Sequence, residues 1–144
     1  MSTVDRLTEI EIGLLHDWSL FVSKKHSECF HRISKLNVDF NMSDYQRLNS
    51  LSKWLELLAC YETRDESLFQ ARFKSLQDYI QVKTQSSGVE RLLLMHLNSS
   101  FSAESRKAEF ENLIASGSMD FKKLRMAFSF MDVHSWIIES AKNQ

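Results

Sequence analysis

The sequence predicts an all-α fold: a single-domain irregular helical bundle of about six helices with a long N-terminal helix. Two observations support this. The 144 residues contain no proline and only three glycines, whereas β-sandwiches and barrels need many tight turns that use Gly, Pro or Asn-Gly pairs. Several segments also repeat apolar residues at helical spacing. The length suits one domain, which we expect to span residues 1–144.

The first predicted helix covers residues 3–36. At 100° per residue one face collects most of its apolar side chains. That face contains Val4, Leu7, Ile10, Leu14, Leu15, Trp18, Phe21, Val22, Cys29, Ile33 and Leu36. The phase continues through Gly13, which we expect inside the helix at a cost of about 1 kcal/mol. A continuous helix of this length would measure about 50 Å. Either it breaks near residues 23–27, or the protein is elongated, or a partner covers the overhang.

The second and third helices are predicted over residues 43–62 and 63–83. Each opens on a capping-box pattern, in which a Ser or Thr is followed three residues later by Gln or Glu. Ser43 precedes Gln46 in this way, and Thr63 precedes Glu66. The short link between the two helices predicts an antiparallel hairpin.

The second half of the chain contains the clearest linker, TQSSG at residues 84–88. A short fourth helix is predicted over residues 89–97, opened by a third capping box in which Ser87 precedes Glu90. A fifth covers residues 103–115, and Gly117 follows as the left-handed residue that ends many helices. The sixth begins at residue 119 or 120 and runs to about 141.

The sixth predicted helix contains the apolar stretch MAFSFMDVHSWII, residues 126–138. Its apolar side chains form two stripes on nearly opposite sides. One stripe contains Phe121, Leu124, Ala127, Phe128, Met131 and Ile138, and the other contains Met119, Met126, Phe130, Val133, Ile137 and Ala141. A helix that is apolar on two sides is buried on two sides. It is either the central helix of its own bundle or a helix shared with a partner; alternatively, AFSFMDV is a strand.

Few residues suggest chemistry. The segment HSECFH, residues 26–31, holds one Glu-x-x-His pair, whereas di-iron bundles need two such pairs and two further glutamates. We interpret it as a solvated polar patch, with a metal site between two chains as the alternative. Cys29 and Cys60 form no C-x-x-C motif and are expected to be buried. The sequence therefore predicts no catalytic residue, no metal ligand and no cofactor, and we expect the protein not to be an enzyme.

The net charge is −1, and no segment forms a basic or acidic tail. Nucleic-acid binders usually carry a marked basic excess. The one basic cluster contains Lys122, Lys123 and Arg125, with Arg106 and Lys107 expected nearby. Positive charge in the first turn of a helix opposes the macrodipole. The cluster is therefore either a solvated patch or a site for a negative group.

The expected function is that of a small helical protein-binding module, such as a regulator, adaptor, immunity or chaperone-like protein, acting through apolar helix faces. The alternative is a dimeric DNA-binding transcriptional regulator. The expected partner is another protein or a second copy of the chain; nucleic acid is not favoured. Neither a signal peptide nor a membrane span is apparent, so we expect a cytoplasmic protein. The candidate partner-binding residues are Met119, Met126, Phe130, Val133, Ile137, Lys122 and Lys123.

Overall fold

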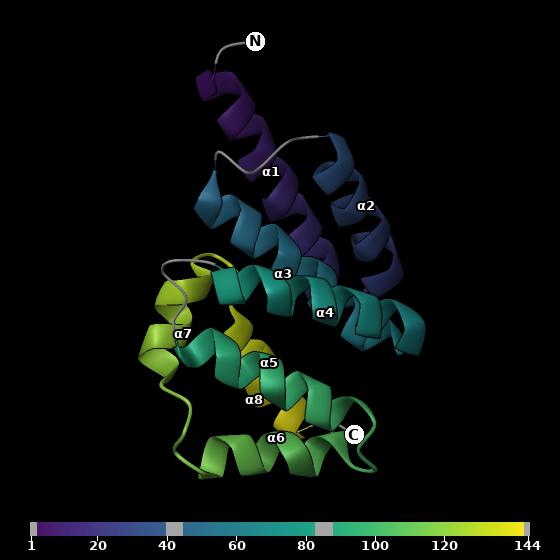
Figure 1. Ribbon diagram of the computed structural model, residues 1–144, viewed down its shortest axis with the longest axis vertical. Coiled ribbons are helices and arrows are strands. Elements are labelled where there is room, and N and C mark those ends of the chain that lie inside the picture. Colours follow the sequence, from purple (N-terminus) through teal and green to yellow (C-terminus); the bar gives the residue numbers. More distant parts are fainter. Residues whose placement is uncertain (1–2, 40–44, 83–87, 143–144) are drawn as a thin grey trace. The chain divides into compact units, whose positions relative to one another are not determined.

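Helices make up most of the chain in the computed structural model, which describes residues 3–39, 45–82 and 88–142 (Figure 1). Within those ranges there are eight helices and no strand. They are α1 (Thr3–Val22), α2 (His26–Asp39), α3 (Gln46–Thr63), α4 (Glu66–Val82), α5 (Gly88–Phe101), α6 (Arg106–Ala115), α7 (Phe121–Phe128) and α8 (Val133–Lys142). The all-α prediction is confirmed. The number of helices is eight rather than about six, because two of the predicted helices are each broken in two.

The first break separates α1 from α2 within residues 23–27, which was one of the three alternatives that the sequence left open. Lys24 adopts a left-handed backbone conformation, with φ of 65°. The Lys25 N–H donates to the Leu20 carbonyl at 2.9 Å, and the Lys24 N–H donates to the Phe21 carbonyl at 3.0 Å. These two bonds form a Schellman motif, which satisfies the last carbonyls of a helix. Glycine usually occupies the left-handed position, so a lysine there gives no sequence signal.

The second break separates α7 from α8 and explains the unusual stretch at residues 126–138. Ser129 has a positive φ of 56°, and its N–H donates to the Arg125 carbonyl at 3.1 Å. Asp132 then opens α8 by accepting from the Ser135 N–H at 3.0 Å and the Ser135 hydroxyl at 2.6 Å. The turn resets the helical phase. The two-stripe helix and the strand alternative are therefore both wrong.

Of the three predicted capping boxes, the structure describes the cap residue of one, and there a different residue caps the helix. Thr63 ends α3 and donates its hydroxyl to the Cys60 carbonyl at 3.0 Å, so it does not cap α4. Asp65 caps that helix instead, accepting from the Leu68 N–H at 3.1 Å. The expected caps Ser43 and Ser87 lie outside the described residues. Gly117, with φ of 68°, follows α6 as predicted.

The chain packs as two compact units, which we call the N-terminal unit (Met1–Arg72) and the C-terminal unit (Phe73–Gln144). In the N-terminal unit α1, α2 and α3 lie side by side (Figure 1). α3 contacts both of the others, and eleven of its eighteen residues are buried. It is the central helix of this unit. The expectation of one domain over residues 1–144 stays a prediction.

The C-terminal unit is built from shorter helices. α8 packs against both α6 and α7, and α5 contacts the same two helices. Three of these helices begin on a side-chain cap: besides Asp132 of α8, Ser105 accepts from the Ala108 N–H at 3.1 Å, and Asp120 from the Lys123 N–H at 3.1 Å. A side chain at the cap satisfies one of the four N–H groups that a helix start leaves without a partner.

Candidate protein-binding surfaces

The residues that the sequence nominated for partner binding do not form one surface. Their burial divides them into three groups. Met119, Val133 and Ile137 are buried, Phe130 is half-buried, and Met126, Lys122 and Lys123 are exposed. For Val133 and Ile137 the cause is the turn between α7 and α8, which places these two residues on a different helix. A partner-binding role for any of them stays a prediction.

The three exposed candidates do share one face of α7. Met126 is 75% exposed and lies between Lys122 and Lys123 around the helix. Arg125, also exposed, points its guanidinium to His134 on α8, with 3.0 Å between Nη1 and Nδ1. Arginine can only donate, so the Nδ1 atom of His134 is the acceptor in this contact. The result is a short basic face with one apolar side chain at its centre.

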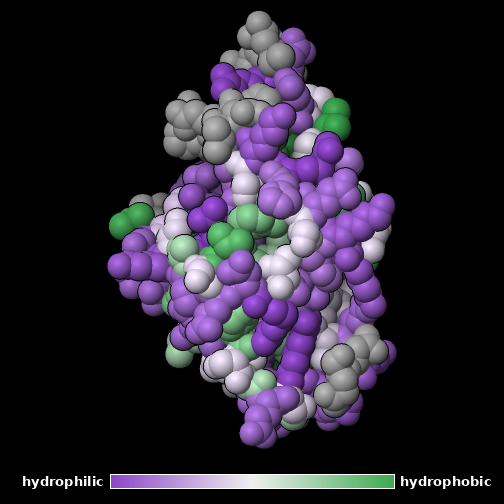
Figure 2. Space-filling model, turned by 90° about the vertical axis from the view of Figure 1, so that its right-hand side faces the viewer, coloured by the Kyte–Doolittle hydropathy of each residue, from purple (hydrophilic) through white to green (hydrophobic). Residues whose placement is uncertain are grey.

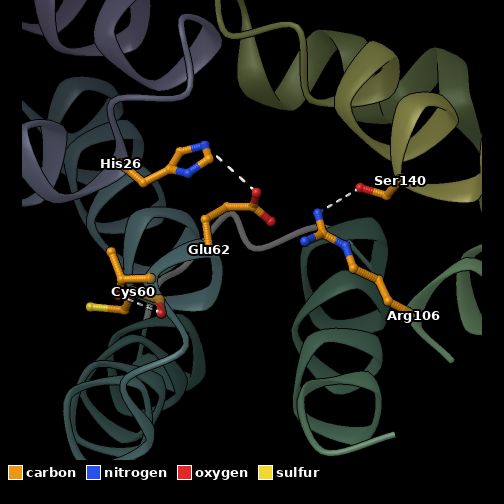
Figure 3. A network of polar contacts seen from close by, with 6 residues as sticks. His26, Cys60, Glu62, Arg106 and Ser140 are labelled. Carbon is orange, nitrogen blue, oxygen red and sulfur yellow. Dashed lines mark hydrogen bonds and ion pairs between the residues drawn. The ribbon is translucent and has the colours of Figure 1, made fainter. Parts of the chain in front are cut away.

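Arg106 and Lys107, expected near that basic cluster, have other partners. Lys107 pairs with Glu111 along α6, with 2.7 Å between Nζ and Oε1. The Arg106 guanidinium donates to the Ser140 hydroxyl at 2.8 Å (Figure 3). It also lies over the rings of Phe110 and Trp136. A cation above aromatic faces is attracted by their quadrupoles. Arg106 therefore joins α6 to α8 within the fold.

An aromatic cluster surrounds this arginine. The Phe110 ring is fully buried and meets the rings of His96 and Trp136 edge to face, with centroids 4.6 Å and 5.4 Å away. Burial lowers the pKa of His96 below its ordinary value, and Glu109 acts in the opposite direction. The neutral imidazole suits an apolar site. This cluster belongs to the core of the C-terminal unit.

Polar bridges join the helices of the N-terminal unit. Glu56 of α3 accepts from the Ser34 hydroxyl at 2.9 Å and pairs with Arg72, with 2.7 Å between Oε1 and Nε. The Nε2 atom of His26 lies 3.6 Å from Oε2 of Glu62 (Figure 3). Carboxylates on the central helix thus tie α2 and α4 to it.

Asp17 is a buried carboxylate, 3% exposed, on the inner face of α1. Its Oδ1 atom lies 3.5 Å from Nε of Arg32 on α2. Burial raises the pKa of Asp17 above its ordinary value, while Arg32 and His16 act in the opposite direction. Desolvation therefore outweighs the ion pair, as expected when one partner stays half in water.

The HSECFH segment lies at the start of α2. Glu28 and His31 are exposed, and His26 is engaged with Glu62. Across residues 3–39, 45–82 and 88–142, no three His, Cys, Asp or Glu side chains gather in a way that would hold a metal ion. Cys29 and Cys60 are buried, as expected, and burial raises the pKa of each thiol to about 12. Both thiols are therefore protonated and unreactive near neutral pH.

The most unusual surface is the outer face of α1, which the sequence had assigned to the core in part. Leu15 and Val22 are 50% and 61% exposed, and Ile12 is 61% exposed. Two small residues, Thr8 and Ser19, continue the same row. We call these five residues the outer row of α1. A single wheel over residues 3–36 placed Leu15 and Val22 among the core residues because it could not show that the helix ends at Val22.

The surface is otherwise mostly polar where Figure 2 views it. Hydrophilic side chains cover most of that face, and hydrophobic ones appear in small patches. In the described part of the chain, no helix combines the length and apolar character needed to cross a membrane. Comparisons with models of protein families, with curated proteins and with solved structures found no match.

Proposed function

We propose that the chain is a small non-enzymatic protein-binding module, of the regulator, adaptor, immunity or chaperone-like kind, and that it binds through an exposed apolar helix face. The observation that carries the proposal is the outer row of α1. Single exposed apolar side chains are common on soluble proteins and need no explanation. Three large ones at helical spacing on one helix are different, because they line one face as a strip, with only Ser19 between Leu15 and Val22.

The strip is well suited to contact with another helix. Its large members, Ile12, Leu15 and Val22, are β-branched or leucine side chains with few rotamers to lose on binding. A helix that buries one apolar face in its own fold and presents a second to solvent is a recurring basis of helix-mediated recognition. The basic face of α7 is a smaller candidate, with Met126 as its apolar centre.

The test compares matched exposed positions. Ile12→Ser with Leu15→Ser removes the strip, whereas Val82→Ser with Met95→Ser removes apolar side chains of similar exposure from α4 and α5. Each tagged chain is cross-linked in its native source, and the attached proteins are identified, including copies of the chain itself. We expect the first pair to lose adducts that the wild type and the second pair keep. Equal adducts from all three chains would contradict the proposal.

A second candidate function, a dimeric DNA-binding regulator, is favoured by the basic face of α7. Lys122, Lys123 and Arg125 lie exposed on adjacent parts of that helix. Contacts to phosphates lose affinity steeply as salt rises, whereas apolar contacts between proteins change little. Titration of mixed-sequence duplex DNA at low and high salt distinguishes a DNA-binding regulator from a protein-binding module. Binding at low salt that is lost in the double variant Lys122→Gln, Lys123→Gln would favour the regulator.

A further inference from the structure

The outer row of α1 follows a coiled-coil pattern. Thr8, Ile12, Leu15, Ser19 and Val22 succeed one another in alternating steps of four and three residues. This is the spacing of the a and d positions of a heptad, with Ile12 and Ser19 at a and the other three at d. Such a seam keeps facing a partner helix along its length. The pattern therefore indicates a helical partner that runs nearly parallel or antiparallel to α1.

The seam is separate from the face that α1 uses in its own fold. Ile10, Leu14 and Phe21 are buried at 0%, 0% and 3% exposure and point to the other side of the helix. Ser19 donates its hydroxyl to the His16 carbonyl at 2.6 Å, so this group already has an acceptor when its surroundings become apolar. The row can thus enter an interface without leaving the serine hydroxyl without a partner.

The charges beside the seam are divided along the helix. Asp5, Glu9 and Glu11 are exposed in its first half, where Arg6 is the single opposite charge. Lys24 and Lys25 are exposed just beyond its last residue. A parallel pair of such helices would place acids beside acids. An antiparallel pair places the acidic half of each helix beside the basic end of the other.

One antiparallel register satisfies both the seam and the charges. With Ile12 opposite Val22 of the second copy, Leu15 comes opposite Ser19, and the two-fold axis repeats both layers. In this register Glu11 comes near the end of α1 of the second copy, and Lys24 and Lys25 follow directly beyond that end. Paired charges at flanking positions set orientation and partner choice in coiled coils. The same antiparallel register thus aligns the apolar layers and brings opposite charges together.

We infer that a second copy of this chain binds along the outer row of α1, antiparallel, with Ile12 over Val22 and Glu11 near Lys25, beyond the end of α1 in the other copy. The inference rests on the proposed function, because it names the partner of the same face. An isologous contact of this kind is closed by its two-fold symmetry, so it produces a dimer and not a filament.

The experiment measures the solution mass by sedimentation equilibrium over a range of protein concentrations. The wild type is expected to reach twice the chain mass of 16.9 kDa. Leu15→Asp is expected to raise the dimer dissociation constant roughly thirtyfold or more, because each dimer loses two seam contacts and gains two desolvated carboxylates. Met95→Asp on α5, where the side chain is 69% exposed, is the matched control and is expected to leave the constant unchanged. Circular dichroism checks that both variants keep the wild-type helicity.

The charge pair tests the orientation. Glu11→Lys alone and Lys25→Glu alone are each expected to weaken the dimer roughly fivefold to tenfold, since each places like charges together twice. The double variant restores opposite charges and is expected to recover most of the affinity. Failure of the double variant to recover, or a dimer that survives Leu15→Asp, would overturn the inference.

A wild type that stays monomeric at every concentration would overturn the inference too, and cross-linking separates this from failure of the proposed function. If the monomer still forms adducts with other proteins that depend on Ile12 and Leu15, the face binds a different protein and the function stands. If those adducts are equally absent, both proposals fail.

Discussion

The two units of this chain reach stability by different means. The N-terminal unit uses longer helices, with α3 at its centre and carboxylates such as Glu56 bridging to its neighbours. The C-terminal unit uses shorter helices, with side-chain caps and an aromatic cluster around Phe110. A long helix can bury one face in the core and still present a second face to solvent, whereas a helix of two or three turns has few residues beyond those that its core needs. The outer row, with its exposed apolar side chains, accordingly lies on α1, one of the longer helices.

The largest effect is expected from Phe110→Ala in the aromatic cluster. The ring is fully buried and contacts His96, Trp136 and Arg106. We expect the free energy of unfolding to fall by about 3–5 kcal/mol, the usual cost of removing a buried ring. Urea unfolding followed by fluorescence measures it, and the half-buried Phe121→Ala is the control with a smaller loss. A loss below about 1 kcal/mol would contradict the role of the cluster.

Glu56→Ala tests the bridges of the N-terminal unit. The substitution removes the acceptor of Ser34 and the ion-pair partner of Arg72. We expect a loss of about 1–3 kcal/mol, the range for hydrogen bonds to charged groups. Glu56→Gln keeps an acceptor for Ser34 but no charge for Arg72, so it should lie between the alanine variant and the wild type in urea unfolding. Equal stability of all three proteins would show that the bridges contribute nothing.

Asp132→Ala removes the cap of α8, with an expected loss of about 1 kcal/mol at neutral pH. Hydrogen bonds from Ser135 lower the pKa of Asp132 below its ordinary value. A lowered folded-state pKa gives stability that is present above the unfolded pKa and is lost as the pH falls through the folded one. The difference in unfolding free energy between the variant and the wild type should therefore become smaller in acid. A gap that is constant with pH would contradict the charge contribution.

Lys24→Gly tests the break between α1 and α2. A non-glycine residue in the left-handed conformation costs about 1 kcal/mol, and glycine avoids this cost. We expect a gain of about 0.5–1 kcal/mol in the unfolding free energy of dilute protein. Ser23→Gly, one residue earlier and without a positive φ, should not stabilise. A destabilised Lys24→Gly protein would indicate that the lysine side chain matters more than its backbone.

The smallest effect concerns Asp17 and has the opposite sign to that of Asp132. Its raised pKa means that the folded state binds a proton more tightly than the unfolded state, so protonation favours folding as the pH falls. Asp17→Asn removes this contribution. Relative to the wild type, the variant should be most stable at neutral pH and lose that advantage in acid. Urea unfolding at several pH values measures it; an advantage that grows in acid would contradict the desolvation account.

The all-α class was predictable because the sequence contains no proline and only three glycines. The end of α6 was predictable because Gly117 follows it with a positive φ. The break after α1 was one of three alternatives that the sequence left open, and the break after α7 was not expected. Lys24 and Ser129 have positive φ values, which sequence rules expect at glycine. Asp132, three residues before Ser135, was the available signal for the second break. The candidate residues on α8 followed from assuming one continuous helix. Ile12, Leu15 and Val22 of the outer row are evident in the sequence as apolar residues. Their exposure depends on how α1 packs against its neighbours, which a helical wheel does not show.

The central claim is that the outer row of α1 meets a second copy in one antiparallel register. Disulfide trapping tests it directly: a chain with Ile12→Cys is mixed with a chain carrying Val22→Cys under mild oxidation. The native Cys29 and Cys60 are buried, with pKa values of about 12, and should not compete. We predict cross-linked dimers in the mixture and few in either chain alone. Cross-linking by each chain alone, or none in the mixture, would contradict the register and the contact it defines.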